Sequence, residues 1–227
     1  MVENFAEKFA LIFERVKAHL ESAPGCHDFE HTLRVLHHAR VLASLIRSDL
    51  QIVELAAVLH DIARPEELTA KGKCCHAKIG SEMARNLVFE VFRDATHAAA
   101  VGEAVRTHRY RGKDHPQTVE AKIVYDADKL DSLGAIGIGR AFLFAGRENA
   151  RLHNTKEEAL GSAAYSREDT AYREFLVKLC KLPGVMQTAE GKKIAKKRLR
   201  FMEKFFDELS DEIYCTGDAA VSGKNTF

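Results

Sequence analysis

Two adjacent residues that can bind a metal ion, His60 and Asp61, stand near the end of an apolar run. The run QIVELAAVLHDIAR covers residues 51–64, and its other side chains predict a helix buried in a core. A neutral imidazole and a carboxylate are costly to bury unless something compensates them. A divalent cation would compensate both, because imidazole nitrogens and carboxylate oxygens are ligands for such ions. This pair therefore predicts a metal site.

A metal site needs ligands from other parts of the chain, and the sequence contains them at wide intervals. His31 precedes the His-Asp pair, Asp128 follows it, and His76 and His108 lie in between. Asp128 lies on the flank of an apolar stripe in a predicted helix, so we expect it to face away from open solvent. Two more aspartates occur in that helix, Asp126 and Asp131. Three carboxylates so close together repel one another unless a cation intervenes.

The elements that must position these residues are predicted to be helices. Apolar residues recur at three- and four-residue steps over about 3–20, 28–47, 48–63, 75–92, 94–110, 118–133 and 188–214, with Asp28 and Asp94 as caps. No stretch shows the alternation of a strand. We therefore expect an all-α fold, a single globular helical bundle over residues 1–214, followed by a flexible tail over 215–227.

Two connecting stretches are predicted to be polar loops. Pro65 disfavours helical geometry at Arg64, so the third helix should stop just past His60-Asp61, by about residue 63, and a loop should cover 66–73. The stretch 147–170 is polar and irregular, which is typical of a lid, a partner surface or a mobile loop. The spaced glycines of 134–139 follow no predicted strand, so they indicate close helix packing rather than a dinucleotide loop.

Composition and charge limit the partners and the cellular location that we expect. The formal net charge is +1, so nothing calls for nucleic acid or an anionic membrane as an obligatory partner. We expect neither a signal peptide nor a transmembrane segment, and the five cysteines, without a CxxC pair, suit reduced thiols in a cytoplasmic protein. Adjacent Cys74 and Cys75 lack the spacing of a structural zinc site.

The last predicted helix carries a basic face and buries apolar residues that include Phe201. The basic residues are Lys192, Lys193, Lys196, Lys197, Arg200 and Lys204. Charged residues along one face of a helix usually do no more than face solvent. We therefore predict a solvated surface, with nucleic-acid binding as the alternative.

The order His31, then His60-Asp61, then Asp128 resembles the HD-domain metal-dependent phosphohydrolase superfamily. The segments HDFEHTLRV (27–35), LHDI (59–62) and DADKLDSLGA (126–135) look like its small bacterial branch, which includes proteins similar to nucleoside triphosphate pyrophosphohydrolases. The resemblance implies that these four side chains bind one divalent ion: manganese, iron, cobalt, nickel, zinc or magnesium. Bound water would then attack phosphorus.

The binuclear branches of this superfamily use further histidines between the His-Asp pair and the last aspartate, where His76 and His108 lie. Here Arg109 replaces the second consecutive histidine expected at that point, and no Gly-Tyr-Pro follows. We therefore expect one metal ion, with His76 and His108 in contact with the phosphate of the substrate or with water. Whether they hold a second ion stays open.

The general acid or base is harder to assign. Related nucleotidases place a glutamate three residues after the motif aspartate, but this chain has Arg64 there. Glu66 and Glu67 are the nearest substitutes, although a loop carboxylate is more often simply exposed. Cations that could stabilise charge on the transferred group are Arg34, Arg109, Lys113 and Lys129, and Lys129 could equally pair with an aspartate at the surface.

The sequence thus predicts a metal-dependent phosphohydrolase that cleaves a phosphoanhydride or phosphoester of a nucleotide by means of a metal-bound water. A monophosphate phosphatase and a cyclic-nucleotide phosphodiesterase are enzymatic alternatives. A nucleotide-binding sensor with a retained metal site and little turnover is a non-enzymatic one, and a helical scaffold with incidental histidines is another. The expected partner is a phosphorylated small molecule, without nucleic acid or membrane, and a homodimer is left open.

Overall fold

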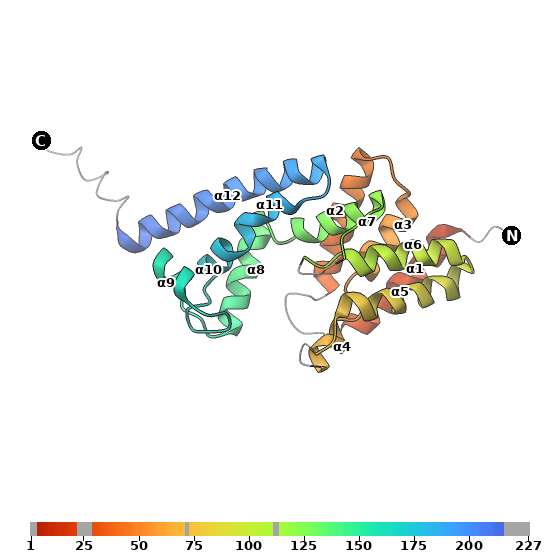
Figure 1. The fold of residues 1–227 in the computed structure, drawn as a ribbon, viewed down its shortest axis with the longest axis horizontal. Helices are drawn as coiled ribbons and strands as arrows, with labels where there is room; N and C mark the ends of the chain where they lie inside the picture. Colours follow the sequence, from red (N-terminus) through yellow and green to blue (C-terminus); the bar gives the residue numbers. More distant parts are fainter. Residues whose placement is uncertain (1–3, 22–28, 71–72, 111–113, 216–227) are drawn as a thin grey trace, which may run out of the picture. The chain divides into compact units, whose positions relative to one another are not determined.

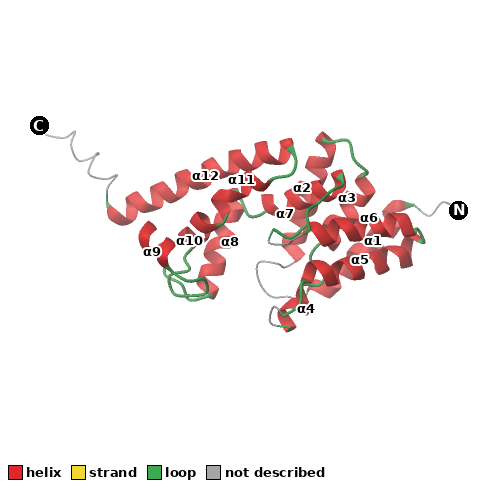
Figure 2. Cartoon of the chain, viewed as in Figure 1, coloured by secondary structure: helices red, strands yellow, loops and turns green. Residues whose placement is uncertain are grey.

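The computed structural model describes residues 4–21, 29–70, 73–110 and 114–215. Within these ranges every regular element is a helix and none is a strand (Figure 2), which confirms the all-α fold. The chain divides into two compact units, one formed by Met1–Asp131 with Gly184–Lys193 and the other by Ser132–Pro183 with Ile194–Phe227. The described helices are too short or too polar to cross a membrane.

Helix α3 is the centre of the first unit (Figure 1). It packs against α1, α2, α5, α6 and α7, and its residues from Val53 to Leu59 are all buried, as expected of a helix that is apolar on every side. The helices of this unit are α1 (Phe5–Leu20), α2 (Phe29–Leu45), α3 (Leu50–Leu59), α4 (Arg64–Thr69), α5 (His76–Phe92), α6 (Ala95–Thr107) and α7 (Val119–Leu130).

Side-chain caps begin several of these helices. Asp94 accepts hydrogen bonds from the backbone N–H groups of Thr96 and His97 at the start of α6, so the predicted cap is confirmed. Asp49 caps α3 and Thr118 caps α7 in the same way. The other predicted cap, Asp28, lies outside the described residues.

The segment after α3 differs from the prediction. Helix α3 ends at Leu59, with His60 as its C-cap, instead of continuing to residue 63. Helix α4 then occupies Arg64–Thr69, where we expected a loop from residue 66. Proline is well tolerated in the first turn of a helix because that turn has no internal acceptor for its N–H groups. Pro65 lies in the first turn of α4, so it accompanies a new helix rather than a loop.

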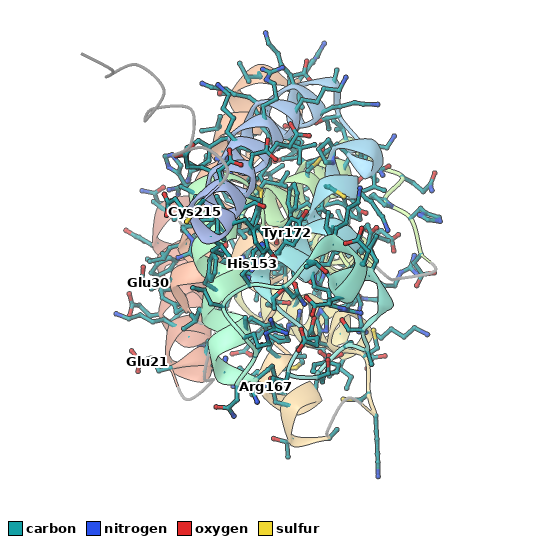
Figure 3. The ribbon with its side chains drawn as sticks, turned by 90° about the vertical axis from the view of Figure 1, so that its left-hand side faces the viewer. Glu21, Glu30, His153, Arg167, Tyr172 and Cys215 are labelled. Carbon is teal, nitrogen blue, oxygen red and sulfur yellow. The ribbon has the colours of Figure 1, made fainter. Side chains whose placement is uncertain are left out.

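The second unit is built around aromatic side chains. The rings of Phe175 and Phe206 stack with their centroids 4.7 Å apart, and His153 stacks on Tyr172 at 5.5 Å (Figure 3). These contacts join the second unit's part of α12 to α10 and to the segment before α9. The elements after α7 are α8 (Gly134–Arg147), α9 (Lys156–Gly161), α10 (Ala171–Val177), the 3₁₀ helix η1 (Leu179–Lys181), α11 (Leu182–Val185) and α12 (Ala189–Tyr214).

The stretch 147–170 is irregular over 148–155 and 162–170, as predicted, but it also contains a helix that was not expected. It contains α9, which begins with a capping box: Thr155 accepts from the N–H of Glu158, and the Glu158 carboxylate accepts from the N–H of Thr155. The hydroxyl of Thr170 donates to Asn154 over 2.8 Å, and both residues are buried. Hydrogen bonds between polar groups therefore order this stretch around one short helix.

The spaced glycines partly confirm the expected close packing. Gly134 has a φ of 77°, and a Cβ on Gly137 would collide with the carbonyl group of Ser132. A Cβ on Gly139, by contrast, would meet nothing within 4 Å. Phe201 of α12, expected in the core, is 52% exposed.

Asp126 holds the residues that precede α12. Its buried carboxylate accepts hydrogen bonds from the N–H groups of Gln187 and Thr188, each over 2.8 Å, and from the Thr188 hydroxyl over 2.6 Å. A Cβ on Gly191 would collide with the same carboxylate. Asp126 on α7 thus caps the start of α12 rather than facing a cation.

We predict that Asp126→Ala lowers the free energy of unfolding by about 2–4 kcal/mol, because it leaves buried N–H donors without an acceptor. Thr188→Val removes only the hydroxyl contact, and we expect it to cost about 1 kcal/mol. Urea denaturation followed by circular dichroism measures both. Equal midpoints for Asp126→Ala and the parent chain would contradict this role.

Candidate metal centre

Three side chains from different helices meet in the first unit. His31 lies in the first turn of α2, His60 is the C-cap of α3, and Asp128 is in the last turn of α7. The Nε2 atoms of the two histidines are 3.2 Å apart, and Asp128 Oδ1 is 3.4 Å from Nε2 of His31. Both imidazoles are fully buried. We call this set the first ligand group.

The other ring nitrogen of each histidine has a hydrogen-bond acceptor. His60 Nδ1 lies 2.8 Å from the carbonyl oxygen of Ala57, and His31 Nδ1 lies 2.7 Å from Oδ2 of Asp131. These oxygens only accept, so each Nδ1 carries the hydrogen and each Nε2 of the neutral ring presents a lone pair. Burial lowers the pKa of His60 to about 3, which keeps that ring neutral.

A second group of the same kind lies beside the first. The Nε2 atoms of His76 and His108 are also 3.2 Å apart, and Oδ1 of Asp61 is 3.3 Å from one and 3.4 Å from the other. His76 begins α5 and His108 is the C-cap of α6. We call His76, His108 and Asp61 the second ligand group.

The histidines of the second group are oriented in the same way as those of the first. His108 Nδ1 lies 2.6 Å from the carbonyl oxygen of Val105, and His76 Nδ1 lies 2.9 Å from Oε2 of Glu67. Burial lowers the pKa of His76 to about 4. A neutral imidazole that points a lone pair inward attracts a cation rather than a phosphate.

Asp61 lies between the two groups. Its Oδ1 faces the second group, while its Oδ2 is 3.6 Å from Nε2 of His60 and 3.8 Å from Nε2 of His31. The carboxylate is buried, and Arg64 Nε donates to Oδ1 over 3.1 Å. One carboxylate can therefore offer an oxygen to each group.

The donor sets fit divalent metal ions. Lone pairs that face each other at 3.2 Å repel unless a cation or a proton lies between them. Two nitrogen ligands about 2.1 Å from one ion stand about 3 Å apart when the angle between them is close to a right angle. In each group the three ligand atoms lie within 4.8 Å of one another. Among the described residues these are the groups with that property.

Lys129 contacts both groups. Its buried ammonium donates to Oδ2 of Asp128 over 2.7 Å and to the carbonyl oxygen of His108, and it lies 4.3 Å from the centre of the Tyr125 ring. Burial alone would raise the pKa of Asp128, but Lys129 and the nearby imidazoles hold that pKa well below its usual range. Lys129 is thus paired with an aspartate, as one of the two predictions had it, but in the interior rather than at the surface.

The other predicted acid–base and phosphate-binding residues have partners within the chain. The Glu67 carboxylate accepts a hydrogen bond from Nη1 of Arg64 over 2.6 Å and also contacts His76. Nη1 of Arg109 lies 3.4 Å from the other oxygen of this carboxylate. Glu66 lies 3.2 Å from His19. None of these contacts tests binding of a substrate, so these roles stay predictions.

Arg34, a predicted phosphate contact whose role also stays a prediction, has a partner within the chain. Its Nε and Nη2 donate to the two oxygens of Asp131 over 2.7 and 3.1 Å, so it steadies the carboxylate that orients His31. Lys113, another predicted phosphate contact, lies outside the described residues. Asp131 itself was missed as a functional residue, although its place three residues after Asp128 put it on a neighbouring face of the same helix.

Comparison with known proteins finds a matching family model and relatives that cover most of the chain. The HD domain model matches residues 28–133. The uncharacterised protein YpgQ of Bacillus subtilis is 31% identical over 208 residues, which cover 87% of this chain and 90% of YpgQ. The crystal structure of YpgQ in complex with ADP matches 92% of this chain and 96% of its own, with 27% identity and a TM-score of 0.70.

Two further proteins are similar over different lengths. An HD-superfamily hydrolase from Bacillus thuringiensis matches 93% of this chain and 99% of its own, with 27% identity and a TM-score of 0.72. Ribonuclease Y of Chloroflexus aurantiacus is 32% identical over 142 residues, which cover 63% of this chain but 24% of that enzyme. The chain therefore spans about a quarter of ribonuclease Y.

The depressed histidine pKa values predict how stability depends on pH after metal is removed with a chelator. Below about pH 6.5 the unfolded chain binds protons on His60 and His76 that the folded chain does not bind. The free energy of unfolding should therefore fall by about 1.4 kcal/mol per pH unit for each imidazole as the pH drops toward about 4. Urea denaturation across this range measures the slope, and His60→Gln with His76→Gln should flatten it. A parent chain equally stable throughout the range would contradict the neutral, buried rings.

Proposed function

Since the chain belongs to the HD-domain superfamily of hydrolases, we propose that it is a metal-dependent phosphohydrolase that acts on nucleotides. The observation that carries the proposal is the pair of ligand groups that share Asp61, in each of which the Nε2 atoms of two buried histidines face each other at 3.2 Å. The complex of YpgQ with ADP supports a nucleotide as the ligand.

We assign His31, His60, Asp61 and Asp128 to one metal ion. The geometry of His76 and His108 supports a second ion, in place of the single ion and the phosphate contacts that we expected from the sequence. A divalent ion bound to these groups would lower the pKa of a coordinated water and neutralise charge on a phosphate oxygen.

The chain's own residues prepare these ligands. Asp131 and Glu67 keep the Nδ1 hydrogens of His31 and His76 in place, so the Nε2 lone pairs point inward without a change of tautomer. Asp61 fixes the spacing of the two groups through its two oxygens. Lys129 offsets part of the carboxylate charge and holds the backbone of His108.

The contacts also favour one substrate class. A phosphate or pyrophosphate leaving group is a weak base, whereas the alkoxide released from a phosphate monoester needs a proton from a general acid. The described carboxylates around the ligand groups, Asp128, Asp131 and Glu67, are held by Lys129, Arg34 and Arg64 respectively. Arg64 also occupies the position where related nucleotidases place a glutamate. We therefore infer that phosphoanhydrides of nucleoside triphosphates are the substrates, cleaved to a monophosphate and pyrophosphate.

The same engaged carboxylates favour a second candidate, a nucleotide sensor with little turnover. A sensor needs the ligand groups and a nucleotide but no general acid. Turnover distinguishes the two, because tight nucleotide binding without product would support the sensor.

We predict that His60→Gln and Asp61→Asn each lower nucleotide hydrolysis by at least about 100-fold in the presence of manganese, because each removes a ligand atom. His37→Gln, an exposed imidazole on the same helix as His31, should leave the rate unchanged. Initial rates and bound metal, measured by elemental analysis, report both effects. Full activity in Asp61→Asn would contradict the assignment.

Substrate class is tested separately with matched adenosine and guanosine mono-, di- and triphosphates. We expect triphosphates to be cleaved to monophosphate and pyrophosphate, detected by phosphorus NMR. Nucleoside monophosphates should react at least about tenfold more slowly, because their alkoxide leaving group lacks a proton donor. Faster hydrolysis of monophosphates would overturn the phosphoanhydride assignment while leaving the metal assignment intact.

A further inference from the structure

Arg64, the first residue of the short helix labelled α4 in Figure 1, contacts two carboxylates of the site. Its Nε donates to Oδ1 of Asp61 over 3.1 Å, and its Nη1 donates to Oε2 of Glu67 over 2.6 Å. Oδ1 of Asp61 is the oxygen that faces His76 and His108. Oε2 of Glu67 is the oxygen that orients His76. The guanidinium therefore holds the carboxylate ligand of the second ligand group and the carboxylate that orients one of its histidines.

The turn between α3 and α4 fixes the position of Arg64. Its backbone N–H donates to the carbonyl oxygen of Asp61 over 2.9 Å, so the two residues are also tied along the backbone. Arg64 and Glu67 are three residues apart on α4, which places their side chains on the same side of that helix. The Arg64 side chain is 21% exposed, and a guanidinium stays protonated. Its charge is thus permanent and only partly screened by solvent.

The cation beside the first ligand group is placed differently. Lys129 donates to Oδ2 of Asp128, whereas Oδ1 of that carboxylate is the oxygen 3.4 Å from Nε2 of His31. The oxygen that faces the first group is therefore left to a metal ion. In the second group, Arg64 donates to the ligand oxygen itself, Oδ1 of Asp61.

The two groups also differ in the carboxylates that they offer. The first group includes Asp128 and can use Oδ2 of Asp61 as well. Among the described residues, the carboxylate grouped with the second pair of histidines is Asp61, whose Oδ1 already accepts from Arg64. A divalent ion would therefore meet more carboxylate oxygen and less opposing charge at the first group than at the second.

We propose that Arg64 keeps the second ligand group a weaker metal site than the first, so that one ion stays on the chain while the other exchanges. The inference rests on the proposed function in one respect, the use of both groups as metal sites. A positive charge within a few ångströms of the site repels an incoming cation, and a hydrogen bond to the ligand oxygen makes that oxygen a poorer donor. Arg64 is thus a positioning residue that acts through Asp61 and Glu67 rather than on the substrate.

Manganese binding without nucleotide tests the proposal. Isothermal titration calorimetry of the full chain, after metal is removed with a chelator, measures the affinity of each binding event. Electron paramagnetic resonance reports a second Mn²⁺ beside the first, because two such ions that share a carboxylate are magnetically coupled. We expect the parent chain to bind its first ion at least about tenfold more tightly than its second. His76→Gln should remove the weak event and leave the tight one, which assigns the weak event to the second group.

The decisive variant is Arg64→Gln, which removes the charge. We expect the second ion to bind at least about tenfold more tightly than in the parent chain, and the affinity for the first ion to change by less than about threefold. Arg64→Lys keeps the charge and should keep the second event weak. A purely structural role for Arg64 predicts the opposite result for Arg64→Gln, because loose ligands would bind the second ion less tightly.

The matched control is Arg173→Gln in the second unit. Nη1 of Arg173 donates to Asp169 over 2.8 Å, and its side chain is 13% exposed, so the same substitution removes a similarly buried ion pair. Both manganese affinities should stay as in the parent chain. Circular dichroism checks that each variant is folded, and Arg64→Met, which keeps a long apolar side chain, gives the same test if Arg64→Gln does not fold.

The remaining outcomes decide the proposal in one direction or the other. A parent chain that binds one ion, with a second gained in Arg64→Gln, would support it. Equal affinities for the two ions in the parent chain would overturn it without any variant, and so would a second event that Arg64→Gln weakens or leaves unchanged. Two unequal manganese sites without nucleotide hydrolysis would refute the proposed function and leave this inference intact. A chain that binds no manganese would overturn both.

Discussion

The orientation of four imidazole rings is the constraint on which the candidate site depends. Each ring has its Nδ1 against an oxygen that only accepts hydrogen bonds, so its Nε2 points into the site and presents a lone pair when the ring is neutral. Lone pairs facing each other at 3.2 Å in two places are unfavourable by themselves. The fold therefore holds an arrangement that a cation or a proton between the rings compensates, and the packing of the surrounding helices must offset the repulsion until one binds.

The two ligand groups have the same arrangement of helix ends. In each, one histidine lies in the first turn of a helix, and the other is the C-cap of the helix packed against it. The last carbonyl groups of a helix have no partner within it, so a C-cap ring can donate its Nδ1 hydrogen to the carbonyl three residues earlier. His60 and His108 both do so. The first-turn histidines cannot reach such a carbonyl, and carboxylates orient them instead: Asp131 for His31 and Glu67 for His76.

This arrangement explains what could and could not be predicted from the sequence. Helical periodicity was enough to predict an all-α fold. The order of His31, His60-Asp61 and Asp128 was enough to expect that they meet, through its resemblance to the HD-domain superfamily. From the sequence we expected no second metal ion at His76 and His108, because Arg109 replaces the second consecutive histidine of the family's binuclear branches. The geometry of the second ligand group instead depends on the end of α6 lying beside the start of α5, which neighbouring residues in the sequence do not encode. The segments 64–69 and 156–161 were missed because helices of six residues are too short for a hydrophobic period, although the capping box at Thr155 was a usable signal.

Asp126 and Asp128 of α7 and its C-cap, Asp131, show how one helix serves the site and the fold together. Successive residues turn by about 100° around a helix axis, so Asp126 and Asp128 point to opposite sides, whereas Asp128 and Asp131 lie only about 60° apart. Asp126 therefore caps the start of α12 on one side of α7. On the other side, Asp128 joins the first ligand group and Asp131 orients His31. From the sequence, the three aspartates suggested one shared cation. In the structure they have three different roles: Asp128 is a candidate ligand, Asp131 orients His31 and Asp126 caps α12. Any movement of α7 would displace all three, so the geometry of the ligands is tied to the packing of residues 184–193 against α7.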